Sequence, residues 1–546
     1  MSQPIKYLKM LIDSFLNALG LKKTLNSSLR YHDWISEKEK TLYESMQINT
    51  RATQKISIVV VLESVQNFEQ INKTILSILE QVSPNWELLI SVRNIPKELQ
   101  YIEDKRVRLI QRKNEACFYI SANEAAQQAQ GSLLTFLKEG DQLSTYAVAS
   151  LNECKDEDDS LKTIISDEDY LNSNNERCDP FFKPDWNPDY LTNYNYFSQA
   201  VAYDRKLFID LCGFNFKVND PYHDLALRAT DLLDDGQIGH ISKILFHLKQ
   251  HHKGEIYRTQ FDIHEPVPLV TVIIPTKDQL ELLKTCLDGL FNNTNYENIE
   301  IIVIDNQSQQ SETLEYLIEL EINQKIRILR YDKPFNYSEM NNIAVRGAKG
   351  SLLCFLNNDI SMIKKDWLTE MVSQAIRPEI GCVGAKLLYP DGTIQHAGVI
   401  LGLKGYASHA HKGFEGVAKG YFNRLQVVHN VSAVTAACMV VRKEVFESVG
   451  GFDATNLKVA YNDVDLCLKV REAGYRNLFT PHAQLIHHES KSRGKKRSKE
   501  QQKQLRAESA YLLEKWGEGL FSDPAYNKNL TLLKEDFSLG FDRINK

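Results

Sequence analysis

The chain has 546 residues, which is long enough for two or three domains, each with its own core. Hydrophobic residues make up 43% and charged residues 25%, and the net charge of -6 gives no overall attraction to nucleic acid. The nine cysteines are scattered without a CxxC pair, so we expect reduced thiols in a cytoplasmic protein. The sequence has no signal-peptide pattern at its start and no run of about 18 apolar residues that would span a membrane.

An amphipathic helix at residues 5–23, "IKYLKMLIDSFLNALGLKK", is the first element that the sequence predicts. Its apolar side chains lie mostly on one helical face, and lysines stand at both ends. Such a helix either packs on a neighbouring domain or lies on an anionic membrane surface. We therefore predict a helical N-terminal segment at 1–54, with peripheral contact at the inner face of the cytoplasmic membrane as the second alternative.

Two stretches of the chain repeat one pattern of elements. Each opens with a β-branched strand, a loop and an amphipathic helix, "KISIVVVLESVQNFEQINKTILSILEQV" from Lys55 and "LVTVIIPTKDQLELLKTCLDGLFNN" from Leu269. A second strand follows at 86–92 and at 299–306, and later an alanine-rich helix, a strand and a polar loop. Strands that alternate with helices predict βαβ units. Repetition after roughly 210 residues indicates two copies of one α/β domain.

Polar side chains follow a buried strand of the second copy. The apolar run "LLCFL" at 352–356 is followed directly by "NND" at 357–359. In open α/β sheets ligands bind at the edge where the strands end. The first copy has "KEG" at 138–140 in the corresponding place, so we expect a ligand site in the second copy and a changed one in the first.

The second copy strongly resembles the family 2 glycosyltransferases with a GT-A fold, in particular the branch that builds bacterial surface polysaccharides such as O-antigen. The matching motifs are "VTVIIPT", "IIVIDNQS", "PFNYSEMNNIAVRGAKG", "FLNNDI", "VGAKLLYPDGTIQHAGVILG", "AVTAACMVVRKEVFESVGGFD", "YNDVDLCLKVREAGY" and "HHESKSRG". The first copy resembles the same family less closely, through "SDEDY", "FFKPDWNPDYL", "CGF" and "KILFH". The resemblance implies two tandem GT-A domains with Rossmann-like, mostly parallel sheets. We place them at 55–262 and 263–500, with a C-terminal helical brace at 501–546.

Transfer of a sugar from a nucleotide diphosphate donor to a hydroxyl of a glycan is the activity that this resemblance implies. The resemblance also suggests a lipid-linked glycan as the acceptor. A divalent metal ion, Mn²⁺ or Mg²⁺, would bridge the donor diphosphate. Asp359 resembles the last member of the metal-binding DxD-like motif, and His487 of "LIHHES" resembles the histidine that completes the metal site. Asn357 and Asn358 stand where the family has carboxylates, so the predicted site carries less negative charge.

The same resemblance implies further donor-binding residues. Asp305 ends a predicted strand and resembles the aspartate that contacts the nucleotide base or ribose. Pro275 and Thr276 end the neighbouring strand and are assigned to the donor as well. Arg493 lies in the basic tract "KSRGKKRSK", which is either a solvated loop or a mobile flap that approaches the donor phosphates.

The proposed general base is Asp463 in "YNDVDLCLKV", which resembles the aspartate that deprotonates the acceptor hydroxyl in an inverting displacement. Asp465 lies about 200° further around the helix, so both carboxylates cannot face one substrate, and we predict a supporting role for it. When Asp224 of the first copy is aligned with Asp465, Tyr222 falls opposite Asp463. The second domain is therefore predicted to be catalytic, and the first to be a degenerate scaffold or acceptor platform.

Two alternatives remain open at this point. In one, both domains act and add two sugars in turn. In the other, the chain is a non-catalytic assembly protein of a polysaccharide machine. The presence of Asp359, Asp463 and His487 favours catalysis over pure binding. Three further histidines that match family positions are interpreted as acceptor-side or loop residues: His396, His409 and His411.

Overall fold

The computed structural model describes residues 30–44, 54–63, 67–112, 117–251, 254–488 and 498–541. The predicted helix at 5–23 and the predicted donor residue Arg493 lie outside these residues. The N-terminal part that is described is helical and includes α3, Lys40–Glu44. Within the described ranges, no helix has the length and apolar character that crossing a membrane requires.

The first half of the chain builds a mixed sheet with the order β3-β2-β1-β4-β8-β6-β9-β5, and β7 pairs with β6. Its strands are β1 Ile56–Leu62, β2 Trp86–Val92, β3 Val107–Gln111, β4 Leu133–Lys138, β5 Gln142–Leu143, β6 Thr163–Leu171, β7 Arg177–Phe181, β8 Val201–Asp204 and β9 Ile238–Leu248. Its helices are α4 Phe68–Leu79, α5 Phe118–Ala126, α6 Ala147–Glu157, α7 Pro188–Asn193, α8 Arg205–Asp210 and α9 Pro221–Thr230.

The second half builds another mixed sheet with the order β12-β11-β10-β13-β20-β15-β21-β14, in which β16 pairs with β15 and β19 with β21. Its strands are β10 Val270–Thr276, β11 Ile299–Asp305, β12 Arg327–Arg330, β13 Leu352–Leu356, β14 Ile360–Met362, β15 Ile380–Leu388, β16 Ile394–His396, β19 His429–Val431, β20 Cys438–Arg442 and β21 Arg476–His487. A separate hairpin joins β17 Val399–Leu401 to β18 Ala407–His409. The helices are α10 Leu280–Asn292, α11 Ser311–Ile322, α12 Tyr337–Gly347, α13 Trp367–Ala375, α14 Lys443–Ser448, α15 Asn462–Glu472 and α16 Lys499–Trp516.

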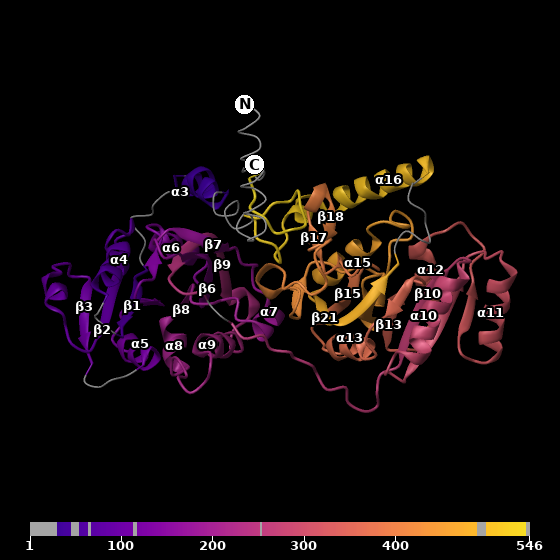
Figure 1. The fold of residues 1–546 in the computed structure, drawn as a ribbon, viewed down its shortest axis with the longest axis horizontal. Coiled ribbons are helices and arrows are strands. Elements are labelled where there is room, and N and C mark those ends of the chain that lie inside the picture. The colour runs from indigo at the N-terminus through magenta and orange to yellow at the C-terminus, as the bar shows by residue number, and fades with distance from the viewer. Residues whose placement is uncertain are drawn as a thin grey trace, which may run out of the picture.

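The two sheets have the same strand order when only the eight strands on the main path of each sheet are counted along the chain, leaving out β7, β16 and β19. The sheets lie side by side along the long axis of the molecule (Figure 1). In both, the first four strands pair in parallel, and the fourth strand pairs antiparallel with the strand that follows it in the sheet. The strands at the centre are buried on both faces, which explains their continuous apolar runs. The predicted α/β fold with two similar, mostly parallel sheets is confirmed.

Direct hydrogen bonds join the two halves. Asn187 Nδ2 donates to the carbonyl of Asn430 at 2.9 Å, and the N–H of Asn430 returns a bond to Asn187 Oδ1 at 2.9 Å. Arg377 donates to Asp189 at 2.5 Å across the same interface. The segment that follows α16 also reaches the first half, because Asn527 Nδ2 donates to the fully buried Asp167. These contacts fix the two sheets relative to each other.

Candidate functional site

The predicted donor residues that the structure describes lie together at the carboxyl edge of the second sheet. Thr276 and Asp305 are register partners at the ends of β10 and β11, and Pro275 precedes them inside β10. Asn358, which follows β13, donates from Nδ2 to Thr276 Oγ1 at 2.9 Å. Asp305 is buried and forms an ion pair with the partly exposed Arg330. The edge therefore presents a charge-compensated carboxylate beside a hydroxyl and an amide.

Asp359 and His487 meet because the short strand β14 pairs with the end of β21. Ile360 and His487 are antiparallel partners, and the N–H of His488 donates to the carbonyl of Asp359 at 2.9 Å. This pairing brings His487 Nε2 to 3.1 Å from Asp359 Oδ1, and both side chains are buried. The amide nitrogen of Asn357 lies 3.4 Å from the same ring nitrogen. The sequence-predicted pair thus occupies one place in the fold.

These side chains fit a divalent cation that shares its ligands with a diphosphate. Together they offer one carboxylate, one imidazole and one amide, and the buried Nδ1 of His487 has no hydrogen-bond partner in the part of the chain that the structure describes. In those same ranges, no three histidine, cysteine, aspartate or glutamate side chains are arranged to hold a metal ion by themselves. Mg²⁺ commonly takes one or two carboxylates from the protein and its remaining ligands from water and substrate phosphates.

Asp463 is the second residue of α15, and its carboxylate contacts the loop before β20 that contains Thr435 and Ala436. Oδ2 accepts the N–H of Ala436 at 3.2 Å, and Oδ1 accepts the N–H of Val464 at 2.9 Å. Burial raises the pKa of the half-buried Asp463 above its ordinary value, and these hydrogen bonds, with one from Thr435, offset part of the rise. The backbone carbonyl of Ala437, the residue after Ala436, accepts the N–H of Asn357 at 3.0 Å. This loop therefore connects Asp463 to the carboxyl edge of the sheet.

Asp465 makes contacts that differ from those of Asp463. It is fully buried, accepts a hydrogen bond from the indole of Trp516 at 3.0 Å and forms an ion pair with Lys515 at 2.6 Å. Lys469 lies 3.5 Å from its second oxygen. Asp465 thereby joins α15 to α16, a contact that agrees with the supporting role expected of it.

Replacing Asp465 with asparagine is expected to lower the free energy of unfolding by on the order of 2 kcal/mol, because two lysines lose their shared counter-ion. The midpoint of thermal unfolding, measured by calorimetry, would fall accordingly. Asp391→Asn is the matched control, since Asp391 sits in an exposed turn with Thr393. Equal midpoints for the two variants would show that the α15–α16 contact adds nothing to stability.

The three additional histidines separate into two groups. His396 Nδ1 lies 2.8 Å from His409 Nδ1, and burial keeps the pKa of His396 far below its ordinary value. The Nε2 atom of His396 accepts the N–H of Thr435 at 3.5 Å, so this ring lies behind the loop that holds Asp463. His411 instead stacks on Phe537 with ring centroids 4.3 Å apart, and burial lowers its pKa to about 3.

Sequence reasoning missed three residues of this edge: Arg330, Thr435 and Ala436. Arg330 is the last residue of a short edge strand and is recognisable only once that strand is paired with β11. The loop residues have small side chains, and Ala436 acts through its backbone N–H, which no residue type reveals. The available signal was the short run "TAAC" directly before an apolar strand.

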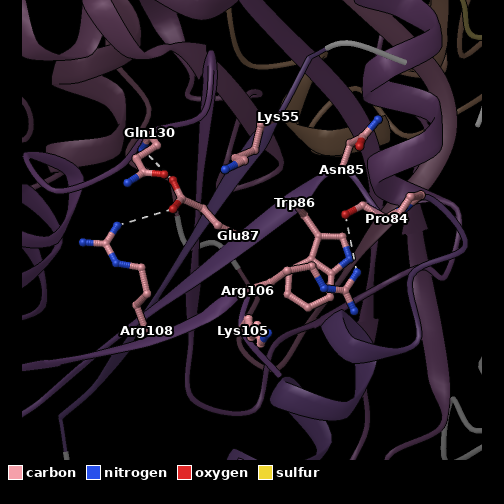
Figure 2. A pocket seen from close by; sticks show the side chains of 9 residues that line it. All are labelled: Lys55, Pro84, Asn85, Trp86, Glu87, Lys105, Arg106, Arg108 and Gln130. Carbon is pink, nitrogen blue, oxygen red and sulfur yellow. Dashed lines mark hydrogen bonds and ion pairs between the residues drawn. The ribbon is translucent and has the colours of Figure 1, made fainter. Parts of the chain in front are cut away.

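A hollow of about 230 Å³ lies in the first sheet, at the edge where its parallel strands β1, β2 and β3 begin (Figure 2). It is lined by Lys55, Pro84, Asn85, Trp86, Glu87, Lys105, Arg106, Arg108 and Gln130. Arg106 pairs with Asp104, and Arg108 lies 3.4 Å from Glu87. The hollow lies where the parallel strands begin, whereas ligands of such sheets bind where the strands end.

The second half is an α/β domain with polar side chains at the edge where its parallel strands end, which is the edge at which such sheets bind ligands. Residues 271–450 match the model of glycosyl transferase family 2. The chain therefore contains a domain of that family, and the match runs from β10 to the end of α14.

Two relatives match most of this chain. The uncharacterized protein y4gI of Sinorhizobium fredii is 38% identical over 520 residues, which are 86% of this chain and 56% of that protein. The O-antigen biosynthesis protein RfbC of Myxococcus xanthus is 34% identical over 508 residues, which are 85% of this chain and 39% of that protein. The chain thus spans about half the length of these curated relatives, or less.

Solved structures resemble parts of the chain more distantly. One is the mannosyltransferase PcManGT from Pyrobaculum calidifontis in complex with GDP-Man and Mn²⁺, with 19% identity and a TM-score of 0.32 over 42% of this chain and 58% of that chain. Another is GalNAc-T7 with UDP, GalNAc and Mn²⁺, with 16% identity and a TM-score of 0.39 over 47% of this chain and 50% of that chain.

Proposed function

We propose that residues 263–500 form a metal-dependent, inverting glycosyltransferase, which moves a sugar from a nucleotide diphosphate donor to a hydroxyl of a growing, lipid-linked surface glycan at the inner face of the cytoplasmic membrane. The observation that carries this proposal is the buried pair of Asp359 and His487, 3.1 Å apart at the carboxyl edge of the sheet. The family match and the similarity to RfbC, an O-antigen biosynthesis protein, support it.

In the proposed reaction, Asp463 accepts the proton of the acceptor hydroxyl. The hydroxyl oxygen bonds to the anomeric carbon while the bond from that carbon to the diphosphate oxygen breaks, and the nucleoside diphosphate leaves with the electron pair. A single displacement of this kind inverts the anomeric configuration. Asp359, His487 and Asn357 would hold the divalent cation, which when bound offsets the charge of the diphosphate. Asp305 and Thr276 would position the nucleotide.

The first domain, at 55–262, is proposed to lack this chemistry. Val92 occupies the position in the first sheet that Asp305 occupies in the second. Val92 ends β2 and pairs with the last residue of β1, and Asp305 ends β11 and pairs with the last residue of β10. Tyr222 is the second residue of α9, as Asp463 is of α15. A valine offers no polar atom to a nucleotide, and a neutral phenol is a poor base at neutral pH.

The metal position of the first domain is also occupied by internal contacts. Asp141 directly precedes β5, as Asp359 precedes β14, but its two oxygens accept the N–H groups of Lys138 and Lys249 at 2.9 Å. Burial raises the pKa of Asp141 to about 6. His247 pairs with β5 as His487 pairs with β14, and it bonds to Asp169 at 2.5 Å. The carboxylate of Asp141 and the ring of His247 therefore already have hydrogen-bond partners within the protein, which leaves them less able to bind a metal ion.

Removal of divalent metal is expected to abolish release of nucleoside diphosphate by the full chain. Release would be measured over a panel of nucleotide sugars with Mn²⁺ and, in parallel, with EDTA. Metal-dependent release from one donor would support the proposal and identify that donor. Equal release with EDTA would contradict the metal role of Asp359 and His487.

A further inference from the structure

The carboxyl edge of the first sheet contains buried polar atoms that the protein leaves without partners. Ser198 Oγ, Gln199 Oε1 and Tyr222 Oη are buried and have no hydrogen-bond partner among the described residues. Ser198 also has a left-handed backbone, with φ of 56°. Buried polar groups are rarely left unpaired, so several at one edge call for a ligand or water that completes them.

Hydrogen bonds connect the segments that carry these residues. The N–H of Ser198 donates to Asn195 Oδ1 at 3.1 Å, and Asn195 Nδ2 donates to Asp220 Oδ2 at 3.3 Å. Asp220 caps α9, in which Tyr222 is the second residue. Gln199 precedes β8, which runs antiparallel to β4, so it emerges where β4 ends.

Partly exposed side chains cover this region. The ring of Tyr119 lies 5.9 Å from that of Tyr222 at a steep angle, and Lys138 Nζ lies 5.6 Å from the Tyr222 ring. Glu139 is the next residue along the chain, and it, Tyr119 and Lys138 are all half-buried. The region therefore combines an aromatic ring with an ammonium group, a carboxylate, an amide and a hydroxyl.

This combination suits a sugar better than a nucleotide or a metal ion. An aromatic ring packs on the apolar face of a pyranose, and fixed polar groups bond to its hydroxyls. The aspartate position for a nucleotide is taken by Val92, and the ammonium group of Lys138 repels a cation.

We propose that the carboxyl edge of the first domain is a carbohydrate-binding site formed by Tyr119, Lys138, Glu139, Gln199 and Tyr222, and that it holds the acceptor glycan. The identity of the glycan as the acceptor rests on the proposed function, whereas binding itself requires no transfer. Because Asn187 and Asn430 fix the two halves, a glycan held there keeps a constant position relative to Asp463.

Binding is tested with the full chain in the absence of nucleotide and metal. A set of defined bacterial surface oligosaccharides is screened on an array, and the tightest is titrated by calorimetry. Tyr222→Phe is expected to weaken binding at least tenfold without lowering the thermal midpoint, since its hydroxyl has no hydrogen-bond partner in the part of the chain that the structure describes. Gln199→Met is a second variant with the same expected loss of binding.

Tyr196→Phe is the matched control, because its hydroxyl accepts the N–H of Asn187 at 2.9 Å and donates to the carbonyl of Asp185 at 3.2 Å. It should lower the midpoint and leave the dissociation constant unchanged. Asp463→Asn should retain full glycan binding.

Three outcomes would overturn the carbohydrate site: no oligosaccharide binding by the wild type, an unchanged dissociation constant in Tyr222→Phe and Gln199→Met, or competition by a nucleoside diphosphate. Glycan binding that persists in a protein with no transfer activity would overturn the proposed function instead, and it would leave the carbohydrate site standing.

Discussion

Replacing Asp463 with asparagine is expected to lower turnover by about 10²–10⁴-fold, the usual contribution of general-base catalysis, while the affinity for the donor stays the same. Asparagine keeps the shape of the side chain and can still accept the N–H of Ala436, but it cannot take the acceptor proton. Turnover is measured as release of nucleoside diphosphate, and donor affinity by calorimetry. If both domains transfer sugar, turnover by the first domain persists in this variant.

The pH dependence of the wild type gives a second readout. Because the pKa of Asp463 is raised, activity should fall on the acid side at a higher pH than a solvated aspartate would give. In the same window the folded state binds more protons than the unfolded state, so the stability contribution of Asp463 falls as pH rises through its folded pKa. Asp463→Asn should therefore keep or raise the thermal midpoint at neutral pH, whereas Asp465→Asn lowers it. Unchanged release in Asp463→Asn would place the base elsewhere.

Asp359→Ala is expected to weaken Mn²⁺-dependent donor binding by about 10²–10³-fold, since a bound metal supplies several kcal/mol of charge stabilisation at a diphosphate. The variant removes the carboxylate that faces His487 and leaves one imidazole and one amide. Donor titrations with Mn²⁺ and with EDTA measure the effect, and paramagnetic resonance of Mn²⁺ reports metal binding without turnover.

Asp391→Asn again serves as the control, because Asp391 lies in an exposed turn of the same domain. Its donor affinity should equal that of the wild type with and without Mn²⁺. Retained Mn²⁺-dependent donor binding in Asp359→Ala would move the metal to other ligands and remove the main support for the proposed reaction.

Much of the fold was predictable because its signals are local. The run at 352–356 is β13 as predicted, and the run at 86–92 is β2, since continuous apolar runs of this length form buried strands. The repeated pattern predicted two similar sheets, and their strand orders agree along the whole path. Asp305 ends one apolar run and Asp359 is the third residue after another, and their predicted roles came from the family resemblance.

Partners that come from distant segments have no local signal. The pair of Asp359 and His487 was expected only from the family resemblance, and its contact depends on the pairing of β14 with β21. Asp465 acquires Lys515 and Trp516 only when α16 packs on α15, which no local pattern predicted. A backbone donor such as the N–H of Ala436 has no residue-type signal at all.

The sequence by itself determined the order of strands and helices, the repeat, and the polar residues at strand ends, because periodicity and spacing act over a few neighbouring residues. Only the tertiary structure decided the 3.1 Å contact between Asp359 and His487, the partial burial of Asp463, and the lack of a hydrogen-bond partner for the Tyr222 hydroxyl among the described residues. These features depend on strand register and on burial, and both arise from contacts between segments that lie far apart in the chain.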